Sequence, residues 1–256
     1  MTLPHLQLAF PEQVRRLVPA VRRGLAFGIP ALDTALPAGV PRGQITALDA
    51  PLGSGGTTLL LALAEATLRS DEGVALVDAE RSLAPQAAAH LAALGSFWVV
   101  RPRAHESAWW CADVLLRTGA FGLVIVDRVP APARRVAVRL QRLAHDKDSA
   151  LVVRVTQAAG RQDRSGYQTS AYGAAMVLAV EPAARSPGFV PALPGWGGAW
   201  PAARRLRVTT LKGGAPRAAE VTVGVPLPDR LRPHWAVRDR RAPERTDRRP
   251  ERKARK

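Results

Sequence analysis

Residues 50–58, with the sequence APLGSGGTT, have the outline of a phosphate-binding loop. In the pattern G-x-x-x-x-G-K-[ST], backbone N–H groups cradle the phosphates, the lysine reaches the β- and γ-phosphates, and the hydroxyl holds magnesium. Gly55, Thr57 and Thr58 fit this pattern, whereas Ala50 and Gly56 depart from it. Because Gly56 takes the lysine position, the loop has the shape for phosphate but lacks the charge.

The loss of the lysine can be put on an energy scale. A hydrogen bond to a charged group contributes about 1.5–3 kcal/mol, which corresponds to roughly 10- to 150-fold in affinity. Backbone amides of residues 53–57 and the start of the next helix remain, so weak nucleotide binding stays open. Phosphoryl transfer also needs the lysine charge on the transferring group. The sequence therefore predicts no robust ATPase activity.

Alternating apolar strands and helices must position this loop. Strands this apolar, alternating with helices, predict an α/β fold whose mostly parallel central sheet is flanked by helices. Two later strands and a turn at 212–214 predict antiparallel edge strands. The expected strands are 44–49, 74–77, 97–100, 122–126, 151–155, 175–180, 205–211 and 218–223, and the expected helices are 57–69, 84–94, 106–118 and 133–145.

Composition and charge narrow the class of protein. The 256 residues are 47% hydrophobic, yet no apolar run is long enough to cross a bilayer and the first residues do not read as a signal peptide. We therefore expect a cytoplasmic protein with no membrane contact. The single cysteine, Cys111, rules out an intrachain disulfide, and we expect it to pack as a small apolar residue on a helix.

The formal net charge of +16 favours contact with nucleic acid. Residues 238–256 hold ten basic and four acidic side chains, a net of +6 in this tail alone. The polar stretch 158–170 and the tail are the candidate DNA contacts. An alternative is that the arginine excess is a compositional bias, because only four of the 37 basic residues are lysines.

Three sequence stretches in order carry a resemblance to a known family. ITALDAPLGSGGTTLLLALAEATLRSDEGVALVDAERSLAP, then GLVIVDRV, then LVVRVTQ, resemble the core of RecA over about residues 27–225. The missing lysine, the length and the basic tail make the chain most similar to the ImuA family. That family consists of RecA-like proteins of the bacterial DNA-damage mutagenesis cassette, which belongs to the SOS response and translesion synthesis.

The resemblance implies a RecA-like P-loop NTPase fold and a set of site residues. It implies an N-terminal interaction segment at 1–25, the RecA-like core at 26–225 and a basic, disordered tail at 226–256. Thr57 and Asp127 would hold magnesium only if a magnesium nucleotide binds, and Glu80 corresponds to the residue that activates water. Gln157 corresponds to the residue that senses the γ-phosphate. The degenerate nucleotide site then consists of Gly53, Ser54, Gly55, Gly56, Thr57, Thr58, Asp127 and Gln157.

Each of these residues also has a structural reading. Asp78, Glu80 and Asp127 end strands next to helix starts, where acidic residues are favoured. Gln157 could bond only to backbone, and Lys212 is either a turn residue or one that reaches a neighbouring subunit's nucleotide. On this reading Glu80 is a vestigial catalytic residue, the chain has no catalytic residue in use, and no cofactor or metal is bound.

The resemblance implies a non-catalytic adaptor between an ImuB-like protein, which is an inactive polymerase relative, and an error-prone DNA polymerase. RecA and DNA are further candidate partners, and the location is nucleoid-associated. Two alternatives stay open: a DNA-stimulated RecA/RadA-type ATPase in recombinational repair, and an inhibitor of cell division. Gly56 separates the first two, because a motor needs the charge that this position lacks.

Tryptophans are candidate contact residues. Trp109 and Trp110 point about 100° apart on one helix, so we expect one to be buried and the other to be a partner anchor. Trp196 and Trp200 could stack on bases, dock a protein or pack on their own domain. The segment 1–25 could dock on a partner or fold back on the core.

Overall fold

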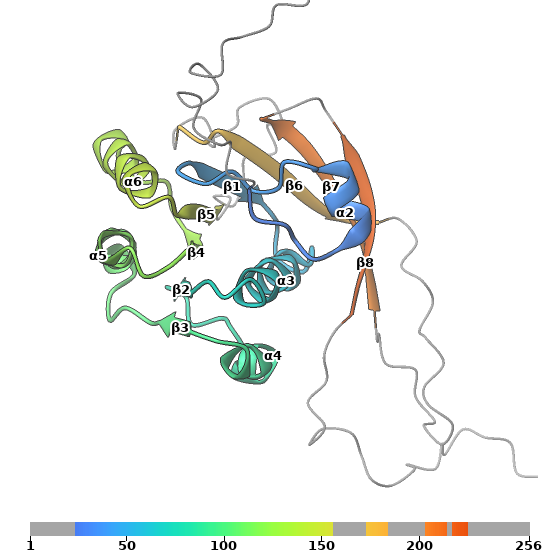
Figure 1. Cartoon of the computed structure of the whole chain (residues 1–256), viewed down its shortest axis with the longest axis horizontal. Coiled ribbons are helices and arrows are strands. Elements are labelled where there is room, and N and C mark those ends of the chain that lie inside the picture. Colours follow the sequence, from blue (N-terminus) through green and yellow to red (C-terminus); the bar gives the residue numbers. More distant parts are fainter. Residues whose placement is uncertain (1–23, 156–172, 184–202, 214–216, 225–256) are drawn as a thin grey trace, which may run out of the picture.

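The computed structural model describes residues 24–155, 173–183, 203–213 and 217–224. Across these residues runs an eight-stranded sheet with the strand order β3-β2-β4-β5-β1-β6-β7-β8 (Figure 1). The strands from β3 to β6 pair in parallel, and β7 and β8 are antiparallel to their neighbours. The predicted α/β fold with antiparallel edge strands is therefore confirmed. The strands are β1 Ile45–Asp49, β2 Val74–Asp78, β3 Phe97–Val100, β4 Leu123–Val129, β5 Ala150–Val155, β6 Met176–Pro182, β7 Ala203–Lys212 and β8 Ala218–Gly224.

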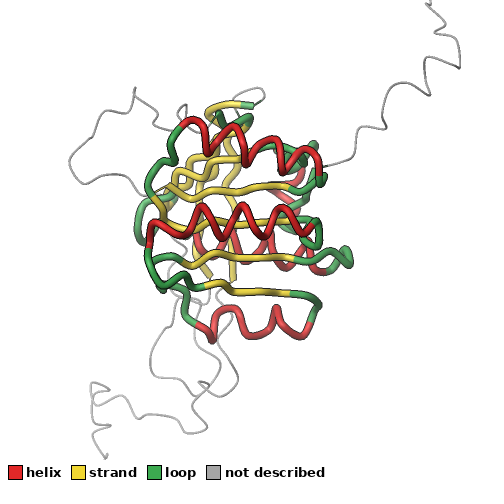
Figure 2. Tube along the Cα trace, turned by 90° about the vertical axis from the view of Figure 1, so that its left-hand side faces the viewer, coloured by secondary structure: helices red, strands yellow, loops and turns green. Residues whose placement is uncertain are grey.

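Helices cover both faces of this sheet, as Figures 1 and 2 show. Alternate residues of the parallel strands point to opposite faces, so Leu76 packs with α3 while Val77 packs with α5. Two separate apolar cores result, one on each face. The helical elements are α2 Pro30–Ala35, α3 Gly56–Leu68, α4 Pro85–Ala88, η1 Ala89–Ala93, η2 His105–Ser107, α5 Ala108–Thr118 and α6 Arg134–Asp146.

Two helices differ from the sequence prediction because part of each has 3-10 geometry. The helix expected at 84–94 is one α-turn, α4, followed by the 3-10 helix η1. Ala88 leaves regular α geometry there, with φ −111°. The helix expected at 106–118 opens with the 3-10 turn η2, and α5 begins at Ala108. Cys111 is buried on α5, as expected.

Strand β4 continues past Asp127, where the sequence prediction ended it. A register shift lies between Asp127 and Val129, and Arg128 in between has a left-handed φ of +55°. Such a bulge inserts a residue and turns side chains at the end of a strand. Only residues 130–133 separate β4 from α6.

Several predicted features lie outside the described residues. They are the N-terminal segment up to residue 23, Gln157, the stretch 158–170, Trp196, Trp200 and the tail from residue 226. Within the described part of the chain, no helix is both long and apolar enough to cross a membrane.

Candidate functional site

The loop at residues 50–55 connects the central strand β1 to helix α3, the strand–turn–helix order that the phosphate-loop pattern requires. Gly53 and Gly55 have positive φ angles of +77° and +95°, which glycine adopts readily. The buried Ser54 donates its amide to the carbonyl of Pro51 at 3.1 Å. That one amide of the loop therefore points into the loop's own turn, and not all amides of residues 53–57 are available for phosphate.

Gly56, at the lysine position, is the first residue of α3. A Cβ atom on Gly56 would lie 2.5 Å from the Cβ of Ala50 and 3.1 Å from Nη1 of Arg154. A distance of 2.5 Å is far below van der Waals contact. The start of α3 is therefore packed for a residue without a side chain.

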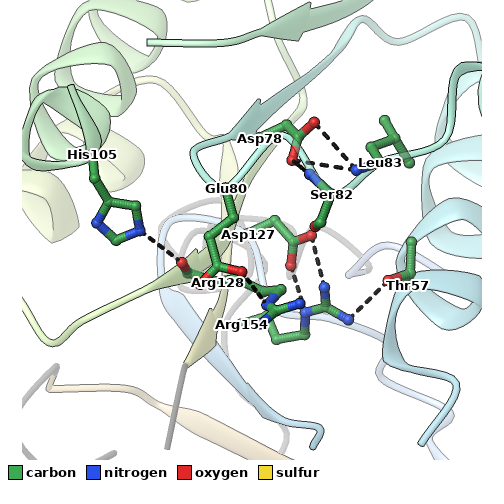
Figure 3. A network of polar contacts seen from close by, with 9 residues as sticks. All are labelled: Thr57, Asp78, Glu80, Ser82, Leu83, His105, Asp127, Arg128 and Arg154. Atoms are coloured by element: carbon green, nitrogen blue, oxygen red, sulfur yellow. Dashed lines mark hydrogen bonds and ion pairs between the residues drawn. The ribbon is translucent and has the colours of Figure 1, made fainter. Parts of the chain in front are cut away.

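Arg154, on β5, is the residue that fills the site. Its Nη1 donates to Oγ1 of Thr57 at 2.9 Å, and its Nη2 donates to Oδ2 of Asp127 at 2.8 Å (Figure 3). Its Nε lies 2.5 Å from Oδ1 of Asp127, an ion pair without hydrogen-bond alignment. The parallel register pairs Asp127 with Arg154 directly, which is why the two side chains meet.

Glu80 and Asp78 are also paired with arginines. Oε2 of Glu80 lies 2.7 Å from Nε of Arg128, the residue at the bulge of β4. Oδ2 of Asp78 accepts from Nε of Arg101 at 3.0 Å, and its Oδ1 accepts from the amide of Ser82 at 2.9 Å. Each of the three acidic residues that the sequence singled out is thus held by its own arginine.

Burial dominates the electrostatics of Asp127. Removal from water raises the pKa of its carboxyl above the usual value, and nearby Asp78 adds to this. The Arg154 guanidinium opposes the rise by charge and by hydrogen bonding. Because an arginine side chain stays protonated in proteins, the guanidinium of Arg154 is a permanent positive charge in the site.

Magnesium, which the loop pattern implies, does not fit the residues present. In phosphate-binding loops the metal lies between the loop hydroxyl and the strand-end aspartate. Here Thr57 and Asp127 both face the guanidinium of Arg154. A metal ion would have to displace a buried arginine before it reached either ligand.

Most of the predicted site residues lie at one end of the sheet. Figure 3 shows Thr57, Glu80 and Asp127 around the arginines, and Thr58 follows on α3. Lys212 is the last residue of β7, and its Nζ donates to the carbonyl of Ala174 at 2.6 Å. The arginines were missed, although an arginine inside the apolar stretch 151–155 is itself a signal, because a buried charge needs a partner.

Comparisons with known proteins agree with this architecture. A family model for the RecA N-terminal domain matches residues 20–163, more than half of the chain. RecA of Paramagnetospirillum magnetotacticum is 42% identical over 101 residues, which cover 39% of this chain and 29% of that protein. The mitochondrial DNA repair protein recA homolog of Dictyostelium discoideum is 33% identical over 140 residues, 54% of this chain and 29% of that protein.

The fold has relatives among solved structures as well. The crystal structure of the RadB recombinase matches with a TM-score of 0.56 and 21% identity, over 75% of this chain and 91% of that chain. At this identity the likeness concerns the fold alone. The part matched in the two curated relatives is under a third of their length.

Proposed function

The chain belongs to the RecA N-terminal domain family, and we propose that it is a non-catalytic accessory protein of that family. The observation that carries this proposal is the arginine on each acidic residue of the site, above all Arg154 on Asp127 and Thr57. Hydrolysis needs a lysine, a metal and a carboxylate that can orient water. Position 56 holds glycine in place of the lysine, and Arg154 occupies the place of the metal. Arg128 forms an ion pair with Glu80, the carboxylate that would orient water.

We propose that this accessory protein acts in DNA damage-induced mutagenesis. The sequence resemblance to the ImuA family supports the role, with an ImuB-like inactive polymerase and an error-prone DNA polymerase as partners bridged for translesion synthesis. RecA is a further candidate partner. The net charge of +16 supports direct contact with DNA, through the tail and the stretch 158–170.

A genetic experiment separates adaptor from enzyme. In a strain that lacks the gene, we expect the wild-type chain and the Glu80→Gln and Thr57→Ala variants to restore damage-induced mutation equally, because none relies on hydrolysis. An Arg128→Met variant serves as a matched control, since it frees Glu80 without removing it. Loss of complementation in Glu80→Gln alone, at normal protein level, would refute the adaptor role.

The second candidate is a DNA-stimulated ATPase of the RecA/RadA type in recombinational repair. It is favoured by the strand–loop–helix course of residues 45–68 and by Glu80, and a relative named RecA fits it. The deciding measurement is phosphate release by the purified chain with and without single-stranded DNA. Turnover that disappears in Glu80→Gln would favour this candidate over the adaptor.

A further inference from the structure

Arg154 bridges three elements at the point where a phosphate-binding loop normally holds its metal. It stands on β5, contacts Asp127 on β4 and reaches Thr57 at the start of α3. Arg154 is 5% exposed and Asp127 2% exposed, so the contact is closed to solvent. The two residues that a metal would use are therefore joined through a cation that belongs to the chain.

Gly56 gives this arginine its room. A Cβ on residue 56 would approach Nη1 of Arg154 to 3.1 Å and its Cδ to 3.3 Å, both tight contacts. A side chain at this position and a guanidinium beside it thus compete for one space. The missing lysine and the added arginine are linked features of this site.

A divalent ion cannot share the position with the guanidinium. Magnesium requires oxygen ligands at about 2.0–2.1 Å in near-octahedral geometry. To bind Thr57 and Asp127 it would have to expel Arg154 from its ion pair with Asp127, and an unpaired buried charge is strongly unfavourable. The burial of Asp127 adds to the barrier, because a hydrated ion would have to shed water to reach the carboxylate.

We propose that Arg154 takes the place of the divalent cation, so that Thr57 and Asp127 are not metal ligands in this chain. The link between β4, β5 and α3, which a metal complex makes only when it is bound, is then permanent. The start of α3 keeps one arrangement in the absence of nucleotide. This inference goes beyond the proposed function, since it holds for any partner.

Manganese binding to the full chain tests the proposal. The probe is Mn²⁺ alone and Mn²⁺ with ADP, followed by the loss of the electron paramagnetic resonance signal of the free ion. We expect no Asp127-dependent binding by the wild-type chain. Arg154→Met should bind Mn²⁺ with ADP at least about tenfold more tightly than wild type, the scale on which groups beside metal ligands act. Addition of Asp127→Asn to this variant should abolish the gain.

Two further variants keep the test decisive. Arg154→Gln replaces Arg154→Met if the latter does not fold, because it also removes the charge and keeps a polar side chain in the buried site. Arg128→Met is the matched control, since it removes an arginine from Glu80 and leaves Thr57 and Asp127 covered. The proposal would be overturned if a folded Arg154 variant bound Mn²⁺ no more tightly than the wild-type chain. It would also be overturned if the wild-type chain bound Mn²⁺ and Asp127→Asn abolished that binding. If such binding came without ATP turnover, the proposed accessory function would still stand.

Discussion

The Cβ atom of Ala50 lies 2.5 Å from the point that a Cβ atom on Gly56 would occupy. These are the two positions at which the loop departs from the phosphate-binding pattern, and in space they are one site. Alanine at position 50 leaves room only for glycine at position 56. A lysine restored at position 56 alone would therefore overpack the site.

Gly56→Ala tests this relationship. On a helix, glycine to alanine normally stabilises by about 1 kcal/mol. Here we expect the free energy of unfolding to fall by about 1–3 kcal/mol, because the new methyl group overpacks the site. Urea denaturation measures the change.

The control is the double variant Ala50→Gly with Gly56→Ala. It removes the opposing methyl group, so it should recover most of the lost stability, and the two substitutions should be strongly non-additive. If Gly56→Ala alone were as stable as the wild-type chain, the two positions would not be coupled.

Removal of either partner of the Arg154–Asp127 pair should be costly, because each removal leaves a buried charge without its counter-charge. Arg154→Met leaves a buried carboxylate without a partner, so we expect a loss of about 3–5 kcal/mol in the free energy of unfolding. Asp127→Asn retains an acceptor but leaves the buried guanidinium of Arg154 without a carboxylate, and because arginine cannot lose its charge we expect a loss at least as large. Chemical denaturation at neutral pH measures both losses, and an Asp127→Asn variant as stable as the wild-type chain would contradict the expected role of the pair.

The raised pKa of Asp127 predicts a direction for the pH dependence. Between its usual pKa and the raised value, the folded chain binds more protons at this group than the unfolded chain. The contribution of Asp127 to stability is therefore greatest at acid pH and falls as pH rises through this window. Arg154→Met removes the group that opposes the rise in the pKa of Asp127, so in this variant the decline in stability should extend to higher pH.

Unfolding experiments from acid to neutral pH check this, with Asp127→Asn as the reference that lacks the titrating group. The stability of the wild-type chain relative to Asp127→Asn should decline as pH rises. A relative stability that increases with pH would show that the arginine outweighs burial and lowers the pKa of Asp127.

Much of the fold could be predicted from the sequence. The uniformly apolar stretch 74–77 marks a strand buried in a parallel sheet, and it is β2 in the structure. The apolar stretch 97–100 is also a strand, but it is the edge strand β3, where Trp98 is 57% exposed. The sequence predicted one regular α-helix at 84–94, whereas the structure has a short α-helix followed by a 3-10 helix. Pro85 favours the start of a helix, but the alanine-rich residues after it have no apolar periodicity strong enough to maintain α geometry. The continuation of β4 through a bulge at Arg128 leaves no signal in local periodicity.

The site was less predictable than the fold. The loop follows from its own motif, Gly56 is a departure from that motif, and Glu80 and Asp127 follow from the resemblance to RecA. The arginines depend on register between strands: Asp127 and Arg154 meet because β4 and β5 pair side by side, 27 residues apart in sequence. Pairing of this kind is a tertiary property, which neither motif nor composition specifies.

Trp110 is the described residue best placed to anchor a partner. It is 67% exposed on α5, whereas Trp109 is partly buried against the core, as the helix geometry predicted. Val114, one turn later, is exposed too. We expect Trp110→Ala to weaken binding to an ImuB-like partner by roughly 30-fold, which corresponds to the loss of about 2 kcal/mol typical of a central aromatic contact.

Titration of the labelled partner with the purified chain measures this affinity. Stability should change little, because the indole ring is mostly in water, so reduced binding cannot be ascribed to unfolding. Leu211→Ala, on β7 near the opposite edge of the sheet, is the control and should bind as the wild-type chain does. If Trp110→Ala bound equally well, the partner would have to contact a different surface.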